Sequence, residues 1–481
     1  MKPIGKRTLL AATMLCLLPF AHAGAADSQP SFLVKNAYIF SMSDKYKKPF
    51  TGYMLIDANG TIMSVAPGTP GAGIHATTTL DAHGHWIMPG FISAHSHLWQ
   101  AAYRGLAQDK TLPGWIDALY DKAASRAQAE DFYWFTLDGA LDHLQHGVTA
   151  AYNFNYGNHW GQPKTERDNV DHQQFRAEMD SGLRFVHGIN PTADAADHSL
   201  DGARQHLRGF IDWSRAQPAS TTFLSVMLNG TVAFQDSPAH AQSEAMLEAA
   251  LMKEFGVSNQ THYLEPPDTI ASEQAVFPYF AQSGMMGPNL IFGHFIHTTP
   301  EILSQTGHAG AAMSWNPLSN GRLASGTADI PTYLKDGIRV GMGEDGEASA
   351  DLADPFENMR TGLYAIRDKY QSASIMSPYD VLRLHTVGSA SVLQVSDRLG
   401  SLEVGKLADF LVIDPTHLAH VFDPYATLVL AASERDLEQV YVGGRLVVDH
   451  GRVLTQDISA VEAQADLRVA ASLPHHAGRH K

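Results

Sequence analysis

Two histidines at the end of an apolar run are the strongest candidates for chemistry in this sequence. The run reads PGFISAHSHLWQ and contains His95 and His97. Because side chains along a strand alternate with period two, both imidazoles would point to the same side. Two imidazoles presented together form a good clamp for a divalent metal ion. The pattern alone is weak, since the chain contains 25 histidines.

A second histidine pair with the same spacing serves as an internal control. His83 and His85 lie in DAHGHWIMPG, next to Gly84 and shortly before Pro89 and Gly90. Glycine and proline at these positions are typical of a connecting segment. We therefore interpret His83 and His85 as part of a linker and not as metal ligands.

More histidines and carboxylates follow at the ends of later strand-like runs. They lie in THYLEPP, IFGHFIHTT and VGMGEDGEAS and comprise His262, Glu265, His294, His297, Glu344, Asp345 and Ser349. Any one of them could be a hydrogen-bonded core histidine or a capping carboxylate. Together they would place histidines and an aspartate on separate strands of one sheet, which favours a metal site.

The segments around these residues predict the fold that would bring them together. Between residues 89 and 400, runs such as GVTAAYNF and GLRFVHGI alternate with longer helical patterns. This alternation predicts parallel strands with crossover helices. In a TIM-like (β/α)8 barrel, the carboxyl ends of all strands converge on one face. We therefore expect an α/β fold with a barrel over 89–400.

Short β-rich runs flank this body on both sides, over 24–88 and 401–460. Asn59-Gly60 is typical of a hairpin turn, and Gly443-Gly444 is a second turn signal. These runs predict one small β-sandwich module built from both chain ends.

The two ends of the chain carry segments that we set apart from the fold. Residues 1–23 combine a basic start, an apolar stretch and the small-residue pattern Ala21-His22-Ala23, which is typical of a cleaved signal peptide. We therefore expect a periplasmic or secreted protein. Residues 461–481 are interpreted as a polar tail, in which His475, His476 and His480 are not expected to hold a metal.

Composition narrows the chemistry further. The one cysteine, Cys16, lies inside the predicted signal peptide, so a metal would be held by histidines and carboxylates. The formal net charge is −16 and we find no basic cluster after the signal. A nucleic acid or an anionic membrane surface is therefore not an expected partner once the signal is cleaved.

The chain resembles the amidohydrolase superfamily, in its branch of cytosine, guanine and adenosine-type deaminases and chlorohydrolases. The resemblance covers about residues 32–455 and rests on DAHGHWIMPGFISAHSH, SWNPLSNGRLASG and GSLEVGKLADFLVID, which occur in the family's order. It implies a small-molecule substrate and one divalent metal ion, with Zn²⁺ favoured and Fe²⁺ as the alternative. Because relatives often form dimers, the resemblance leaves a homodimer open.

The resemblance also implies a role for each candidate residue. The implied metal ligands are His95, His97, His262 and Asp345. Asp345 would also take the proton from the attacking water, Glu265 would shuttle a proton, and His294 would polarise the substrate. His297 is expected to be structural, and no role follows for Glu344.

Three further residues are candidate substrate contacts. Ser349 resembles a position that helps to bind the ring in some relatives. Trp115, in LPGWIDALY, would cover an aromatic substrate or be buried on an amphipathic helix. Asn320 follows the predicted seventh strand, where it and Asn316 would contact the substrate or only shape the turn around Pro317.

Two departures from the family pattern shape the functional hypothesis. GLRFVHGINPTADAADHS contains no lysine that could bridge two metals, so one metal is favoured, and LSVMLNGTVAF lacks the Pro-His segment of many deaminases. The leading hypothesis is hydrolytic deamination of an amino-substituted N-heterocycle. Amide or cyclic-amide hydrolysis, or dechlorination, at the same site is the alternative. A metal-free binding protein on this scaffold is the third, which the complete ligand set disfavours.

Overall fold

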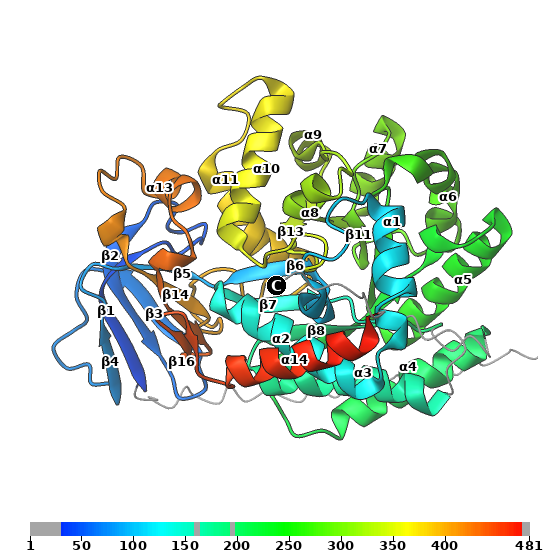
Figure 1. The fold of residues 1–481 in the computed structure, drawn as a ribbon. Helices are drawn as coiled ribbons and strands as arrows, with labels where there is room; N and C mark the ends of the chain where they lie inside the picture. Colours follow the sequence, from blue (N-terminus) through cyan, green and yellow to red (C-terminus); the bar gives the residue numbers. More distant parts are fainter. Residues whose placement is uncertain (1–29, 158–163, 193–197, 474–481) are drawn as a thin grey trace, which may run out of the picture.

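The computed structural model of the protein describes residues 30–157, 164–192 and 198–473. The predicted signal peptide and the histidines near the end of the chain lie outside these residues. The described chain forms an eight-stranded parallel sheet and a nine-stranded sheet beside it (Figure 1). The predicted α/β fold, a TIM-like barrel with a β module built from both chain ends, is confirmed.

The eight barrel strands are parallel and follow each other around the sheet in chain order. They are β6 (Phe91–Ser96), β7 (Val148–Asn153), β8 (Arg184–Ile189), β9 (Phe223–Gly230), β10 (Ser258–Tyr263), β11 (Leu290–His294), β12 (Ala312–Trp315) and β13 (Arg339–Met342). Beyond β13, the backbone N–H of Asp345 donates to the carbonyl of His95 at 2.9 Å, and the N–H of His97 donates to the carbonyl of Asp345 at 2.8 Å. Asp345 is thereby fixed directly against the first strand.

Helices follow the strands, and the longer ones cover the outside of the barrel (Figure 1). The helices include α1 (Leu112–Ile116), α2 (Ala129–Gln145), α3 (Lys164–Ser181), α4 (Leu200–Arg215), α5 (Pro238–Phe255), α6 (Ile270–Gln282), α7 (Pro300–Ala309), α8 (Pro317–Arg322), α9 (Ile330–Lys335), α10 (Pro355–Tyr370), α11 (Pro378–Arg383) and α12 (Ser389–Val392). The short helices α1 and α8 lie at the carboxyl ends of the strands. Local sequence sets their ends: α5 begins after Ser237, whose side chain accepts a bond from the N–H of His240, and ends at Gly256 with φ 66°.

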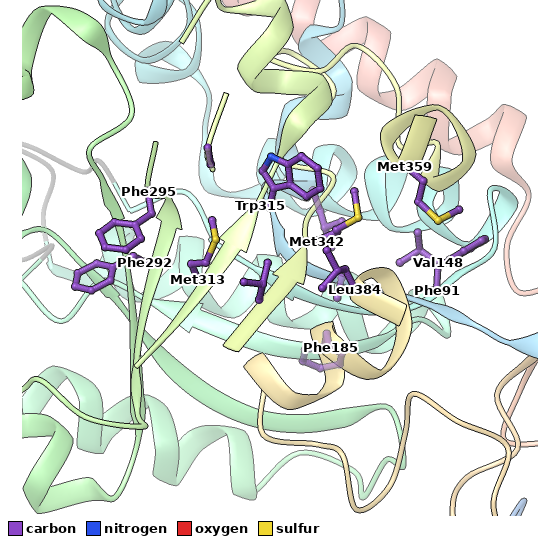
Figure 2. Close-up of a cluster of buried hydrophobic side chains, with 14 of the residues drawn as sticks. Phe91, Val148, Phe185, Phe292, Phe295, Met313, Trp315, Met342, Met359 and Leu384 are labelled. Atoms are coloured by element: carbon purple, nitrogen blue, oxygen red, sulfur yellow. The ribbon is translucent and has the colours of Figure 1, made fainter. Parts of the chain in front are cut away.

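A large hydrophobic core fills the layer between the barrel and these helices (Figure 2). Trp315 of β12 is almost fully buried there and packs against α10. Position 362 on α10 must be glycine, because a Cβ there would come within 2.6 Å of the Trp315 ring. Close packing of this kind holds the strand ends at fixed positions.

The β module combines strands from the two ends of the chain. They are β1 (Phe32–Ile39), β2 (Phe50–Ile56), β3 (Ile62–Pro67), β4 (Thr78–Asp81), β5 (Trp86–Pro89), β14 (Phe410–Ile413), β15 (Leu437–Val442), β16 (Arg445–Asp449) and β17 (Arg452–Val453). The antiparallel pairing of β5 with β14 joins the two ends. The predicted turns are present, with Gly60 between β2 and β3 at φ 79° and Gly443 and Gly444 between β15 and β16 at φ 57° and 72°. The connection between β14 and β15 contains α13 (Pro424–Leu430).

The segment predicted as a polar tail from residue 461 instead forms most of a helix. Helix α14 (Ile458–Ser472) begins after Asp457, whose carboxylate accepts a bond from the N–H of Ala460. The helix packs along α2 (Figure 1), and it buries Val461 and Ala465, which the overall polarity of the segment conceals. Within the described residues, no helix has both the length and the apolar character that a membrane crossing requires.

Candidate active site

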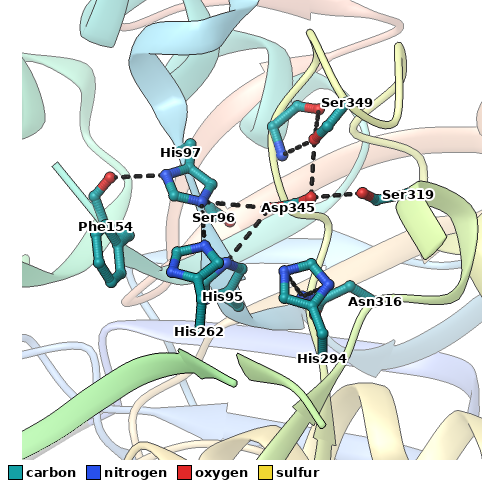
Figure 3. A network of polar contacts seen from close by, with 12 residues as sticks. His95, Ser96, His97, Phe154, His262, His294, Asn316, Ser319, Asp345 and Ser349 are labelled. Carbon is teal, nitrogen blue, oxygen red and sulfur yellow. Dashed lines mark hydrogen bonds and ion pairs between the residues drawn. The ribbon is translucent and has the colours of Figure 1, made fainter. Parts of the chain in front are cut away.

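Four side chains that the sequence predicts as metal ligands meet at the carboxyl ends of the barrel strands. One ligand atom from each of His95, His97, His262 and Asp345 lies within 4.8 Å of all the others (Figure 3). Oδ1 of Asp345 lies 3.3 Å from Nε2 of both His95 and His97. Nε2 of His97 lies 3.1 Å from Nε2 of His262. Three imidazole nitrogens and one carboxylate oxygen therefore converge on one point.

Neighbouring acceptors fix the orientation of two of these rings. The side-chain amide of Gln260 donates to the carbonyl of Ala94 at 2.9 Å, which turns its oxygen toward Nδ1 of His95. Nδ1 of His97 donates to the carbonyl of Phe154 at 3.0 Å. With the Nδ1 protons engaged in this way, Nε2 of both rings is left to present a lone pair to the centre. Nε2 of His95 is fully buried without a hydrogen-bond partner, which is costly unless a cation occupies this point.

Electrostatics favours neutral imidazoles and an ionised carboxylate at this centre. Burial, together with the neighbouring His95 and His97, holds the pKa of His262 well below its usual value. Burial would raise the pKa of Asp345, but the adjacent His95 and His97 hold it well below its usual value. Three neutral nitrogens and one carboxylate oxygen are a donor set that suits Zn²⁺ and leaves the bound ion with net positive charge. The residues present therefore fit a divalent metal ion.

Two serines hold the other oxygen of Asp345. The hydroxyl groups of Ser319 and Ser349 donate to Oδ2 at 2.5 and 2.8 Å (Figure 3). Oδ1 is thereby left to face the histidines. Ser349 lines the cavity described below, as expected for a substrate contact, but its proton has two acceptors in the protein, Oδ2 of Asp345 at 2.8 Å and the carbonyl of Gly346 at 2.9 Å. Its main contribution in this structure is to orient that carboxylate.

The prediction that Asn320 contacts the substrate is not supported by its position, because its side chain lies behind His294. Its amide nitrogen lies 2.7 Å from Nδ1 of His294 and donates to it, which leaves the ring proton on Nε2. Burial lowers the pKa of His294 to about 3, so the ring is neutral at ordinary pH. His294 lines the cavity and can therefore offer an N–H group to a substrate.

Glu265 lies next to His294, with Oε2 3.6 Å from Nε2 of that ring. The hydroxyl of Ser325 donates to Oε1 of Glu265 at 3.4 Å, and Nε2 of His297 donates to the carbonyl of Ser325 at 2.8 Å. His297 therefore supports the segment that holds Glu265. Burial, with a smaller effect of Asp345, raises the pKa of Glu265 well above its usual value. Its carboxyl group can thus hold a proton at neutral pH.

Glu344, for which the sequence suggested no role, points away from the metal ligands. Its Oε1 accepts a bond from Nε2 of His385 at 2.6 Å, and both side chains are buried. Asn358 donates to the same oxygen at 3.4 Å and to the carbonyl of Gly343 at 2.9 Å. This network anchors the segment after β13 that carries Asp345.

A cavity of about 460 Å³ opens beside the four ligands. Trp115 lines it, and the indole N–H donates to the carbonyl of Ala348 at 2.6 Å. Three aromatic residues that the sequence analysis missed also line it: Tyr120, Phe154 and Phe234. Tyr120 lies in a π-helical turn over Asp117–Asp121, a local geometry often found at functional sites.

The control histidines lie elsewhere in the fold. His83 is exposed in the turn between β4 and β5 of the β module. Nδ1 of His85 contacts Glu438 Oε2 at 2.6 Å, and its Nε2 is 3.7 Å from Asp414. Neither belongs to the metal-binding group.

Comparisons with known proteins agree with this geometry. The sequence model of the Amidohydrolase family matches residues 86–447. A 5-methylthioadenosine/S-adenosylhomocysteine deaminase from Desulforudis audaxviator is 27% identical over 443 residues, which cover 90% of this chain and 97% of that protein.

Two solved structures share the fold. An adenosine deaminase from Xanthomonas campestris with bound zinc has a TM-score of 0.79 at 21% identity, covering 92% of this chain and 99% of that chain. An atrazine chlorohydrolase from Arthrobacter aurescens, complexed with zinc, has a TM-score of 0.78 at 22% identity, covering 91% of this chain and 100% of that chain.

Proposed function

The chain belongs to the amidohydrolase family, and on that premise we propose that it hydrolytically deaminates an amino-substituted N-heterocycle at a single Zn²⁺ site. The observation that carries the proposal is the convergence of His95, His97, His262 and Asp345 beside a cavity that Glu265 and His294 also line. A relative named as a deaminase over almost the whole chain supports the choice of reaction. The zinc in the two structural neighbours supports the choice of ion.

The side chains around the cavity have separate roles in this reaction. When bound, a divalent ion supplies the positive charge that lets water act as a nucleophile near neutral pH. Oδ1 of Asp345 faces the histidine nitrogens and accepts a proton from the attacking water. The N–H of His294 donates to the substrate where negative charge develops. Glu265 delivers a proton to the departing nitrogen, which would otherwise leave as a poor anion.

Ammonia release from a panel of heterocycles tests this function. We expect the zinc-loaded protein to release ammonia from at least one amino-substituted pterin, purine, pyrimidine or triazine, with turnover in the usual enzymatic range of about 1–10³ s⁻¹. Cyclic amides and chloro-substituted triazines run in parallel as controls. Hydrolysis of a cyclic amide, or chloride release, without ammonia from any heterocycle would contradict deamination and favour the alternative reactions at the same site.

We further propose that the protein is exported and that residues 1–23 are removed on the way. The basic start, the short apolar stretch and Ala21-His22-Ala23 support this proposal. The mature protein from the producing cells is then expected to begin at Gly24 and to occur in the periplasmic or secreted fraction. N-terminal sequencing and cell fractionation check this, and a cytoplasmic protein that begins at Met1 would contradict it.

A further inference from the structure

The cavity beside the metal ligands has a polar part next to the ends of β8 and β9. Asn190 and Thr192 follow β8, Thr231 follows β9, and all three line the cavity together with His198. The part formed by α1 and the turn after it is instead largely apolar and aromatic, with Leu112, Trp115, Ile116 and Tyr120. A flat ring beside the ligands would therefore lie against aromatic side chains, and a substituent on that ring could reach the polar part.

The hydroxyl groups of Thr192 and Thr231 in the polar part already donate their protons to acceptors within the protein. Oγ1 of Thr231 lies 3.0 Å from Oε1 of Glu244 and 3.4 Å from Oε1 of Glu248, so its proton is taken by a carboxyl oxygen. Oγ1 of Thr192 lies 3.1 Å from Oδ1 of Asn190 and 3.3 Å from Oε1 of Glu244, which are both acceptors. A hydroxyl group has one proton to donate, so both threonines can offer only lone pairs to a ligand.

The ring of His198 extends this arrangement. Its Nε2 lies 3.3 Å from Oε2 of Glu244, a side chain that is 3% exposed and supports the wall from behind. With Nε2 directed to Glu244, the ring has Nδ1 as its other polar atom for a ligand. Thr192, Thr231 and His198 therefore offer acceptors to a ligand, whereas Asn190, whose side-chain oxygen accepts from Thr192, has its amide N–H groups left to donate.

The charges around the cavity oppose an anionic ligand. No lysine or arginine is among the described residues that line it, whereas Asp236 and Asp345 do. The buried carboxyl group of Glu244 lies directly behind the polar part. Among the described residues a phosphate would find no lysine, no arginine and no free hydroxyl donor there, and it would lose its hydration.

We propose that Thr192, Thr231 and His198 form a subsite for a hydroxyl-bearing substituent of the heterocycle, and that this subsite disfavours phosphorylated substrates. The proposal rests on the proposed function in that it places the heterocycle beside the metal ligands. It goes beyond that function because it concerns the group attached to the ring, which the ligands and Glu265 do not select.

Binding of ligands that lack a leaving amino group tests the subsite without requiring turnover. Purine and 2-pyrimidinone are titrated into the zinc-loaded protein by calorimetry, each as the free ring, the riboside, the 2′,3′-dideoxyriboside and the riboside 5′-monophosphate. In at least one series we expect the riboside to bind about tenfold more tightly than both the free ring and the dideoxyriboside, as one or two added hydrogen bonds allow. The monophosphate should bind about tenfold more weakly than the riboside.

The proposal is overturned if the riboside gains no affinity over the free ring in either series, or if the monophosphate binds as tightly as the riboside. This result is separate from the ammonia panel, because a deaminase that acts on free rings would pass that panel and fail here. If the protein binds ribosides but releases no ammonia, the proposed function is contradicted and the proposed subsite is supported.

Two near-isosteric variants then locate the hydrogen bonds. Thr231→Val and Thr192→Val should each lower the affinity for the riboside about fivefold to tenfold and leave the affinity for the free ring unchanged. Thr222→Val is the matched control, since Thr222 precedes β9 at its opposite end and does not line the cavity. Unchanged riboside affinity in both cavity variants, with folding verified by Tm, would contradict the subsite; if one variant fails to fold, the other decides.

Discussion

Replacement of His97 with alanine should remove the metal ion and the activity together. Nε2 of His97 lies 3.3 Å from Oδ1 of Asp345 and 3.1 Å from Nε2 of His262, so the ring occupies the middle of the donor set. Loss of a partner that only orients a ligand costs about 10–100-fold in metal affinity, so loss of the ligand itself should cost at least about 10³-fold. Zinc content after dialysis against a chelator and kcat/KM on the same sample measure both effects.

Gln260→Leu provides a graded comparison with this variant. It leaves all four ligands in place but removes the acceptor that orients Nδ1 of His95. We expect metal affinity to fall by about 10–100-fold, with activity recovered at high zinc concentration. Full activity of His97→Ala without added zinc would contradict the assigned ligand set.

His83→Asn is the matched control for a lost histidine. His83 is the first histidine of the other His-x-His pair, and its side chain is 79% exposed in the β module. Asparagine tolerates the positive φ of 48° at this position. Zinc content and kcat/KM of this variant should equal those of the wild-type protein.

The ligand set could be predicted because the resemblance to the amidohydrolase superfamily assigns these four positions, and because His95 follows a recognisable apolar run. His95 and His262 are the second-last residues of β6 and β10, and parallel strands in a barrel bring their carboxyl ends together. The predicted barrel thus explains why the two residues meet, while the resemblance is what singled out His262 among the histidines of the chain. The β module was predictable for a similar reason, since its turns at Gly60 and Gly443 carry their own sequence signal.

The residues that surround the ligands could not be predicted in the same way. Asn320 and Ser319 are adjacent in the chain, yet one contacts His294 and the other contacts Asp345. These partners depend on loops in which His294 and Asp345 adopt positive φ angles of 64° and 60°, where the alternation of side chains along a strand no longer applies. Of these surrounding residues, only Gln260 could have been found from the sequence. It lies two residues before His262 on the same strand, so the two side chains point to the same side.

Replacement of Glu265 with glutamine should abolish most of the turnover and leave the metal ion in place. Glu265 lines the cavity but is not among the four side chains that converge on the metal position. Glutamine has nearly the same size and can still accept the bond from Ser325, but it cannot deliver a proton. Loss of general acid-base catalysis typically costs about 10²–10⁴-fold, which should appear in kcat at normal zinc content.

The leaving group distinguishes proton transfer by Glu265 from a purely structural contribution. An amino group must be protonated as it departs, whereas chloride leaves as a stable anion without a proton. With a substrate and its chloro analogue on the same ring, Glu265→Gln should therefore impair chloride release at least about tenfold less than ammonia release. Equal losses of ammonia release and chloride release would contradict proton transfer to the leaving group. Glu265 would then act before the leaving group departs or only shape the cavity, because neither role depends on the basicity of the group that leaves.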